Sequence, residues 1–265
     1  MDIDLTGRRA LVTGSTAGIG FAIARALGEL GATVAVNGRT AGRAEAAVAA
    51  LARAAPKGRF LAAPGDVADE AGARAVHAAV PDADILVNNA GIFEPKPFFE
   101  IPDEDWRRFF EVNVLSGVRL SRLYVPGMTA RGFGRVVFIS SESALQIPVE
   151  MVHYGMTKTA QLAVSRGLAE TVAGSGVTVN AVLPGPTLSE GVATFMKEMA
   201  AGIADPDLDA MGRAFVREHR PTSLLGRLAT PEEVANLVAY LCTPAASATS
   251  GAALRVDGGV VRAIV

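Results

Sequence analysis

The N-terminal segment RRALVTGSTAGIGFAIARALGELG joins an apolar run to a helical pattern through a glycine-rich turn. In this turn, Gly14 permits a tight bend and Gly18 lets backbone N–H groups approach a pyrophosphate, while Gly20 allows close helix–strand packing. The start of the following helix also attracts negative charge. The segment therefore predicts a cradle for a dinucleotide. Its glycine spacing differs by one residue from G-x-G-x-x-G, so a plain glycine-rich turn is the alternative.

Short apolar runs alternate with helical patterns along the chain, at residues 10–13, 33–37, 59–63, 85–89, 135–140, 177–183 and 253–256. Continuous Val, Ile and Leu runs are typical of strands buried on both faces, and the helices between them provide the crossovers of a parallel sheet. We therefore expect an α/β fold, a Rossmann-like doubly wound parallel sheet of seven strands with helices on both faces. No repeat or flexible linker divides residues 1–265, which predicts a single domain for cofactor binding and catalysis.

Composition narrows the classes of partner. The formal net charge is −2 and the sequence has no basic cluster, so we expect neither nucleic acid nor an anionic membrane as a partner. Cys242 is the single cysteine, which excludes an intrachain disulfide and fits a reducing compartment. The N-terminal residues lack a secretory pattern and no apolar run approaches membrane-spanning length. These features predict a cytoplasmic protein.

Tyr154 and Lys158 lie four residues apart in the segment HYGMTKTAQLAVSRGLAE. On a helix this spacing places both side chains on one face. A neighbouring ammonium stabilises a phenolate and lowers the pKa of the tyrosine, so Tyr154 is a candidate acid or base. Taken alone, the spacing also fits a half-buried tyrosine beside a solvated lysine.

The motifs together resemble those of the short-chain dehydrogenase/reductase family, from about Leu5 to Val260. The family pattern T-G-x-x-x-G-x-G matches a segment beginning at Thr13, N-N-A-G begins at Asn88, and Y-x-x-x-K begins at Tyr154. The resemblance places the other active-site residues at Ser141 and Asn113, and the P-G segment after the sixth strand at Pro184, Gly185 and Thr187.

The resemblance also implies a role for each of these residues. Ser141 binds the substrate oxygen and Tyr154 transfers a proton to or from it. Lys158 lowers the pKa of Tyr154 and orients the nicotinamide ribose, and Asn113 holds a water that passes protons from Lys158. Two alternatives stay open: Ser140 competes with Ser141 for the catalytic role, and Asn113 caps or kinks its helix.

The choice between NADP and NAD depends on residues 38 and 39, at the end of the second predicted strand. Gly38 occupies the position where an acidic residue would bind the ribose 2′-OH of NAD, and Arg39 follows it. An arginine binds a 2′-phosphate by charge-assisted hydrogen bonds, so we expect NADP to be preferred and NAD to be possible. The alternative is an exposed turn arginine without a ligand.

The resemblance assigns Asp66 and Val67 to the adenine and Asn89 to Gly91 to the adenosine ribose. The predicted cofactor-binding set is Gly14, Ser15, Thr16, Gly18, Ile19, Gly20, Arg39, Asp66, Val67, Asn89, Ala90, Gly91, Tyr154, Lys158, Pro184, Gly185 and Thr187. No metal site is expected, because His77, His153 and His219 are scattered and no cluster has ligand spacing.

These observations predict an NAD(P)-dependent oxidoreductase that transfers a hydride between the nicotinamide and a small carbonyl or secondary alcohol substrate. One alternative is a 3-oxoacyl carrier-protein reductase. Such enzymes present two arginines beside the active-site entrance, whereas here Arg131 would be one and Ser175 occupies the other position. A second alternative is a cofactor-binding protein without turnover.

Residues 187–222 are the least typical part of the chain. Their apolar stripes, Phe195, Met196 and Met199, then Met211, Phe215 and Val216, predict two short helices. These helices form either a substrate lid or a pair packed on the core or on another subunit. The resemblance further implies a homo-oligomer, a tetramer or a dimer.

Overall fold

A parallel sheet forms the centre of the computed structural model, which describes residues 2–199 and 207–264. Its seven strands follow the order β3-β2-β1-β4-β5-β6-β7, and every neighbouring pair is parallel. The strands are β1 (Arg9–Val12), β2 (Thr33–Gly38), β3 (Arg59–Pro64), β4 (Ile85–Asn88), β5 (Gly134–Ile139), β6 (Val177–Pro184) and β7 (Ala253–Val256). The predicted doubly wound α/β fold is confirmed.

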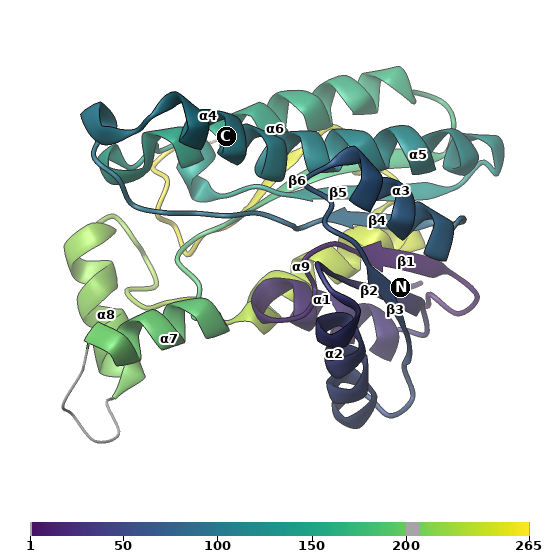
Figure 1. The fold of residues 1–265 in the computed structure, drawn as a ribbon, viewed down its shortest axis with the longest axis horizontal. Helices are drawn as coiled ribbons and strands as arrows, with labels where there is room; N and C mark the ends of the chain where they lie inside the picture. The colour runs from purple at the N-terminus through teal and green to yellow at the C-terminus, as the bar shows by residue number, and fades with distance from the viewer. Residues whose placement is uncertain (1, 200–206, 265) are drawn as a thin grey trace.

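Helices cover both faces of this sheet (Figure 1). One layer contains α1 (Gly18–Glu29), α2 (Ala41–Ala54) and α9 (Pro231–Cys242), and the other contains α3 (Glu70–Ala79), α5 (Ser116–Ala130) and α6 (Val152–Thr171). Helix α4 (Asp103–Phe110) packs against α6 in the second layer, and α7 (Glu190–Met199) and α8 (Leu208–His219) lie outside both layers.

Each central strand contributes to two separate cores. Val12 belongs to the core under α1, α2 and α9, whereas its neighbour Leu11 belongs to the core under α3, α5 and α6. The same alternation separates Val137 from Phe138 in β5. Successive side chains of a strand point to opposite faces, so a strand between two helical layers must be apolar at every position. This requirement explains the continuous apolar runs of the sequence.

Several strands end one residue earlier than their apolar runs predict. Thr13, Asn89 and Ser140 follow the last residues of β1, β4 and β5, and their side chains make hydrogen bonds to neighbouring turns and helices. All of these ends lie at the carboxyl edge of the sheet. The strand order changes direction at β1, between β2 and β4, which is where doubly wound sheets bind their ligands.

Helices α7 and α8 are set apart from the two layers (Figure 1) and share a small apolar cluster. Met196 of α7, Val216 of α8 and Leu228 form its buried centre, and Met211 and Phe215 pack against it. The two predicted helices of this segment are therefore present. The side chains of Phe195 and Met199 lie outside the described residues, as do residues 200–206 as a whole.

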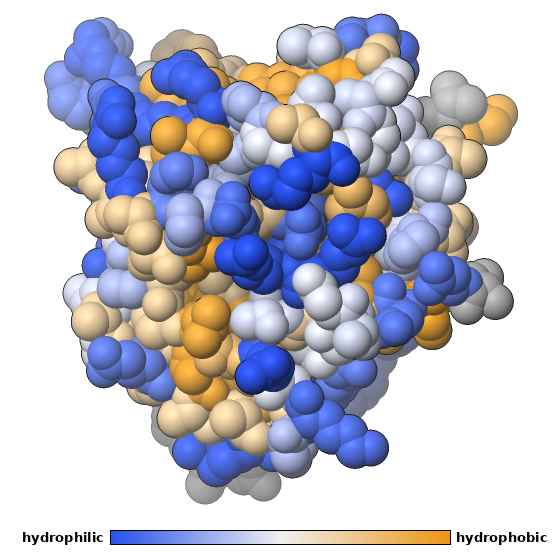
Figure 2. All heavy atoms as spheres, turned by 90° about the vertical axis from the view of Figure 1, so that its right-hand side faces the viewer, coloured by the Kyte–Doolittle hydropathy of each residue, from blue (hydrophilic) through white to orange (hydrophobic). Residues whose placement is uncertain are grey.

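Within the described part of the chain, no helix is both long enough and apolar enough to cross a membrane. Figure 2 shows the side of the molecule turned away from α7 and α8, where hydrophilic residues occupy the centre and hydrophobic residues lie between and around them. This face therefore has no continuous hydrophobic surface.

Candidate active site

The glycine-rich turn after β1 has the backbone geometry that its sequence predicts. Gly14 and Gly18 have φ angles of +58° and +56°. Residues with a side chain rarely adopt this left-handed backbone conformation. A Cβ atom on Gly20 would lie 2.5 Å from both the Asn89 side-chain amide and the Gly14 carbonyl oxygen. Gly20 therefore permits close packing inside the turn and against the NNAG segment, rather than between the helix and a strand as we expected.

Thr13 joins the glycine-rich turn to the NNAG turn. Its buried hydroxyl oxygen accepts hydrogen bonds from the backbone N–H groups of Asn89 and Ala90, each at 2.9 Å. In return, the Asn89 side-chain amide donates to the carbonyl oxygens of Thr13, at 2.8 Å, and Gly14, at 3.1 Å. The two motifs are 76 residues apart in sequence but form one hydrogen-bonded unit.

The residues of this turn fit a pyrophosphate. Helix α1 begins at Gly18 with no acidic residue in its first turn, and Ala17 provides no side-chain cap. Its first N–H groups are therefore available to an anion. Ser15 fastens the turn to β2 instead, because its hydroxyl donates to Val12 and accepts from the N–H of Asn37, and its own N–H donates to the Asn37 carbonyl oxygen at 3.0 Å. Thr16 and Ile19, also predicted to contact the cofactor, are half-buried.

The end of β2 is closely packed at one residue and open at the next. A Cβ atom on Gly38 would lie 2.6 Å from the Thr16 methyl group, so an acidic side chain does not fit there without a shift. Arg39 is exposed. Arg43, in the first turn of α2, is also exposed, and this turn contains no acidic residue. Sequence reasoning overlooked Arg43, although its spacing of four from Arg39 was visible.

The adenine and P-G segments lie at the same edge of the sheet. Asp66 is exposed and Val67 is buried, immediately after β3. Pro184 is the last residue of β6, and Gly185 follows in a position where a Cβ atom would lie 2.6 Å from the Asp257 carbonyl oxygen. Thr187 is buried and its hydroxyl donates to the Gly185 oxygen at 2.9 Å.

Tyr154 and Lys158 lie on one face of α6, as their spacing predicts. Tyr154 is half-buried in the first turn of the helix, and Lys158 is buried with its Nζ 5.5 Å from the centre of the Tyr154 ring. The Lys158 ammonium donates to the Ile139 carbonyl oxygen at 2.9 Å. A Cβ atom on Gly91 would lie 3.5 Å from this Nζ, so the NNAG turn directly adjoins the lysine.

The electrostatics of this pair correct one expectation. Burial raises the pKa of Tyr154 above its ordinary value and the charge of Glu142 raises it further, whereas Ser141 and Arg220 lower it. Burial also lowers the pKa of Lys158 to about 8, against an opposing effect of Glu142. We predicted that the Lys158 cation would lower the pKa of Tyr154, and this is wrong for the structure described. Loss of hydration at Tyr154 outweighs the effect of nearby cations.

The two adjacent serines have different partners. The Ser140 hydroxyl is buried and donates to the Lys158 carbonyl oxygen at 2.8 Å, so it fastens β5 to α6. The Ser141 hydroxyl donates to the Glu142 carboxylate and accepts from the N–H of Ser143 at 3.1 Å. Ser141 is the serine that influences the pKa of Tyr154. This geometry favours Ser141 over Ser140 for contact with a substrate.

Asn113 lies in a π-helical turn, Glu111–Leu115, between α4 and α5. Its side chain is fully buried and bonds both backbone groups of Ile92, at 2.8 and 3.0 Å, together with Thr157. The backbone carbonyl oxygen of Asn113 accepts a hydrogen bond from the Gln161 side-chain amide at 2.6 Å. The Gln161 side-chain oxygen in turn accepts from the Lys158 ammonium at 3.3 Å. Gln161 thus spans the gap in which we expected a water, a contact that sequence reasoning missed.

The arrangement brings a proton donor, a second hydroxyl and a buried cation to the edge of a dinucleotide cradle. Tyr154, Ser141 and Lys158 come from two elements, the β5–α6 loop and α6, and the NNAG turn joins them to the glycine-rich turn. No group of His, Cys, Asp and Glu with metal-binding geometry occurs in the described ranges. The site is that of a nicotinamide-dependent oxidoreductase, and the chain belongs to the short-chain dehydrogenase/reductase family.

Comparison with known proteins supports this assignment. A family model described as enoyl-(acyl carrier protein) reductase matches residues 14–261. The uncharacterized oxidoreductase YvaG of Bacillus subtilis (strain 168) is 48% identical over 264 residues, with 100% of each chain covered. The protein is therefore similar over its whole length to oxidoreductases of this family.

Solved structures give the same result. L-sorbose reductase from Gluconobacter frateurii, complexed with NADPH and L-sorbose, superposes with a TM-score of 0.91 at 34% identity and 100% coverage of both chains. A 7α-hydroxysteroid dehydrogenase complexed with NADH and 7-oxo glycochenodeoxycholic acid gives 0.83 at 31% identity, covering 100% of this chain and 98% of that one. The protein is an NAD(P)-dependent oxidoreductase acting on alcohol or carbonyl groups of small molecules.

The hydroxyl of Thr13 provides a test of how the cradle is held together. In Thr13→Val the shape is retained but the N–H groups of Asn89 and Ala90 lose their acceptor. An unsatisfied buried donor costs about 1–3 kcal/mol, so we expect urea denaturation to show a loss of at least about 2 kcal/mol. Thr13→Ser retains the hydroxyl and serves as the matched control. Equal stability of the two variants would contradict the role given to this residue.

Proposed function

We propose that the protein is an NADP-preferring alcohol dehydrogenase or carbonyl reductase with a small-molecule substrate. The observation that carries this proposal is the contact between the cradle and the catalytic side chains, in which Gly91 adjoins both Asn113 and Lys158. This contact supports a position for the nicotinamide beside Tyr154 and Ser141. The alternative of cofactor binding without turnover is disfavoured, because Asn113, Ser141, Tyr154 and Lys158 are all present.

The mechanism follows from the protonation states of these residues. A reduced nicotinamide held in the cradle would supply a hydride to the carbonyl carbon. Tyr154 is protonated at neutral pH because its pKa is raised, so it donates a proton to the carbonyl oxygen as the alcohol forms. The Ser141 hydroxyl donates to Glu142, so its oxygen is the acceptor for the O–H group of the alcohol that forms. Lys158 is buried with its ammonium hydrogen-bonded to the Ile139 carbonyl oxygen, and it would hold the ribose of the cofactor and return a proton to Tyr154.

The preference for NADP rests on the end of β2. Gly38 leaves no acidic group to repel a 2′-phosphate, while Arg39 and Arg43 supply positive charge beside the uncapped start of α2. Of the related structures, L-sorbose reductase is complexed with NADPH and the 7α-hydroxysteroid dehydrogenase with NADH. The cofactor therefore varies among relatives, and these arginines favour NADP for this chain.

A carrier protein is not the proposed partner. We expected Arg131 beside the active-site entrance, but it precedes β5 and therefore lies at the opposite, amino-terminal edge of the sheet. There it forms ion pairs with Asp82, at 3.6 Å, and Asp84, at 3.5 Å. Ser175, just before β6, lies at the same edge and carries no charge. Because Arg131 is paired with two aspartates and has no second arginine beside it, it offers little attraction to an acidic partner.

The remaining proposals concern the organisation of the protein. Residues 1–265 act as one domain, in which 187–222 form a substrate lid. The lid proposal is supported by the separate apolar cluster of α7 and α8, and by the hydrogen bond from Arg220 to Glu142 and its ion pair with Glu150 in the segment after β5. By likeness to the family, the protein is a cytoplasmic tetramer or dimer without nucleic-acid or membrane partners.

Arg39→Ala tests the cofactor preference. We expect NADPH to bind at least about tenfold more weakly and NADH to bind unchanged, because the guanidinium contacts only the additional phosphate and such a bond is worth roughly 1.5–3 kcal/mol. Titration calorimetry with both cofactors measures this change. Arg53→Ala removes an exposed charge from the far end of α2 and is the matched control. Equal losses of affinity for NADPH and NADH would show that Arg39 does not bind the 2′-phosphate.

Tyr154→Phe tests the proton transfer. The ring still packs but the proton is gone, so turnover should fall by at least about 10²–10⁴-fold while cofactor affinity is retained. Lys158→Ala should reduce both. In the wild type the reduction rate should be flat across neutral pH, because Tyr154 stays protonated below its raised pKa, and the oxidation rate should increase with pH through the alkaline range. Retention of more than about a tenth of turnover by Tyr154→Phe would exclude this tyrosine as the acid.

A further inference from the structure

A buried carboxylate adjoins the catalytic serine, and the proposed function does not account for it. Glu142 is only 4% exposed, although it follows β5 at the carboxyl edge of the sheet. A buried carboxylate is stable only when its oxygens accept hydrogen bonds or face a cation. Glu142 meets both conditions, and its partners lie in two segments that the sequence separates widely.

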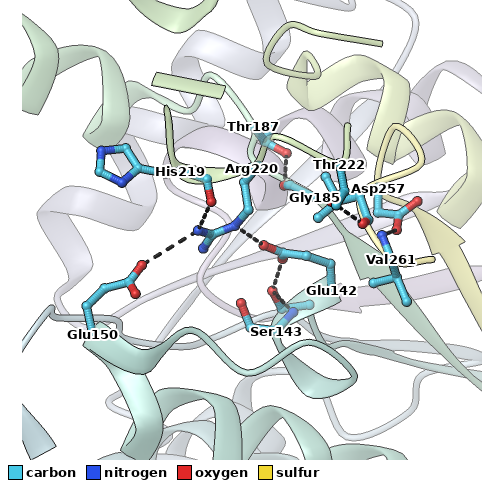
Figure 3. Close-up of polar contacts among 12 residues, drawn as sticks. Glu142, Ser143, Glu150, Gly185, Thr187, His219, Arg220, Thr222, Asp257 and Val261 are labelled. Atoms are coloured by element: carbon cyan, nitrogen blue, oxygen red, sulfur yellow. Dashed lines mark hydrogen bonds and ion pairs between the residues drawn. The ribbon is translucent and has the colours of Figure 1, made fainter. Parts of the chain in front are cut away.

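Each oxygen of this carboxylate has its own partner. The Oε2 atom accepts the hydroxyl proton of Ser141, and the Oε1 atom accepts from the Arg220 guanidinium at 3.2 Å. Figure 3 shows the Arg220 side chain between Glu142 and Glu150, with Glu150 at 3.6 Å. Arg220 is held further by the His219 carbonyl oxygen at 2.8 Å.

The direction of the serine hydrogen bond is fixed by chemistry. An ionised carboxylate only accepts, so the Ser141 proton must point to Glu142. The serine oxygen also accepts the N–H of Ser143, at 3.1 Å, which leaves it a lone pair for an O–H group of Tyr154 or of a substrate alcohol. Glu142 therefore determines how Ser141 faces the reacting oxygen.

We propose that Glu142 is a positioning residue, which orients the Ser141 hydroxyl through one carboxylate oxygen and fastens Arg220 beside the reaction centre through the other. The inference rests on the proposed function, because it assumes that Ser141 and Tyr154 act on the substrate. The ion pair between Glu142 and Arg220 thereby becomes part of the site. Glu142 disfavours an ionised Tyr154, and Arg220 opposes this effect.

Charged side chains near Tyr154 come from three elements, and Glu142 and Arg220 are the two that shift its pKa. Glu142 lies in the short helix Glu142–Ala144, Arg220 follows α8, and Lys158 lies on α6 with Tyr154. Burial and Glu142 raise the pKa of Tyr154 while Ser141 and Arg220 lower it. Glu150, which is 44% exposed, acts through its ion pair with Arg220. Removing Glu142 and removing Arg220 should therefore change the acidity of Tyr154 in opposite directions.

The experiment compares Glu142→Gln, Arg220→Gln and the double variant in the oxidative direction, at a fixed alkaline pH below the Tyr154 pKa. A neighbouring charge shifts a pKa by about one unit or more, so oxidation should be roughly tenfold faster in Glu142→Gln and tenfold slower in Arg220→Gln. The double variant should lie close to the wild type. It leaves no unpaired buried charge, so it remains informative if a single variant does not fold.

Orientation of Ser141 is tested separately from charge. Glu142→Gln retains an oxygen that can accept the serine proton, whereas Glu142→Leu does not, so kcat for reduction should be at least about tenfold lower in the leucine variant than in the glutamine variant. Arg166→Gln removes an ion pair with Glu170 on the exposed side of α6 and is the control that should change neither quantity.

Three results would overturn the inference: rate changes of the same sign in both single variants, no change in either, or equal kcat for Glu142→Leu and Glu142→Gln. Tyr154→Phe distinguishes this failure from failure of the proposed function. If Tyr154→Phe is inactive while the Glu142 and Arg220 variants behave as the wild type, only the positioning role is wrong. If Tyr154→Phe is active, the proposed function itself is wrong.

Discussion

The hydrogen bonds between Thr13 and the NNAG turn are the interaction on which the site depends. They join the end of β1 to the end of β4, at the point where the strand order reverses. The Asn89 side-chain amide donates to the carbonyl oxygens of Thr13 and Gly14, and Gly20 leaves room for this amide, so the glycine-rich turn and the NNAG turn pack directly together. A Cβ atom on Gly91 would lie 3.4 Å from the Asn113 side-chain oxygen and 3.5 Å from the Lys158 Nζ. The cradle and the catalytic side chains thus lie next to one another at the carboxyl edge of the sheet.

Loss of hydration has a larger effect on the pKa values of Tyr154 and Lys158 than neighbouring charges have. The pKa of Tyr154 is raised and that of Lys158 is lowered to about 8, both chiefly because the groups are desolvated. A protonated tyrosine is an acid, which is the state that the proposed reduction of a carbonyl requires. The Glu142–Arg220 pair places opposite charges near this acid, and small changes in either charge should alter its strength.

The fold was predictable because it depends on local patterns. Continuous apolar runs require strands buried on both faces, and the glycines at 14 and 18 require the turn that the structure contains. The site was predictable only in part. The contact between Glu142 and Arg220 joins residues 78 apart, and no local pattern encodes it. The pKa of Tyr154 likewise depends on how completely the folded chain excludes water, which the spacing to Lys158 does not determine.

Tyr154 and the cradle should together perform hydride transfer to a carbonyl. The most direct measurement follows the label from NADPH deuterated at the transferring C4 position, with a panel of ketones, ketoses and keto esters and mass spectrometry of the products. We expect at least one carbonyl compound to become an alcohol with deuterium on the carbinol carbon, as the absorbance of the reduced cofactor falls. It would be contradicted if neither NADPH nor NADH were oxidised by any carbonyl compound, or if the product carbon carried no label.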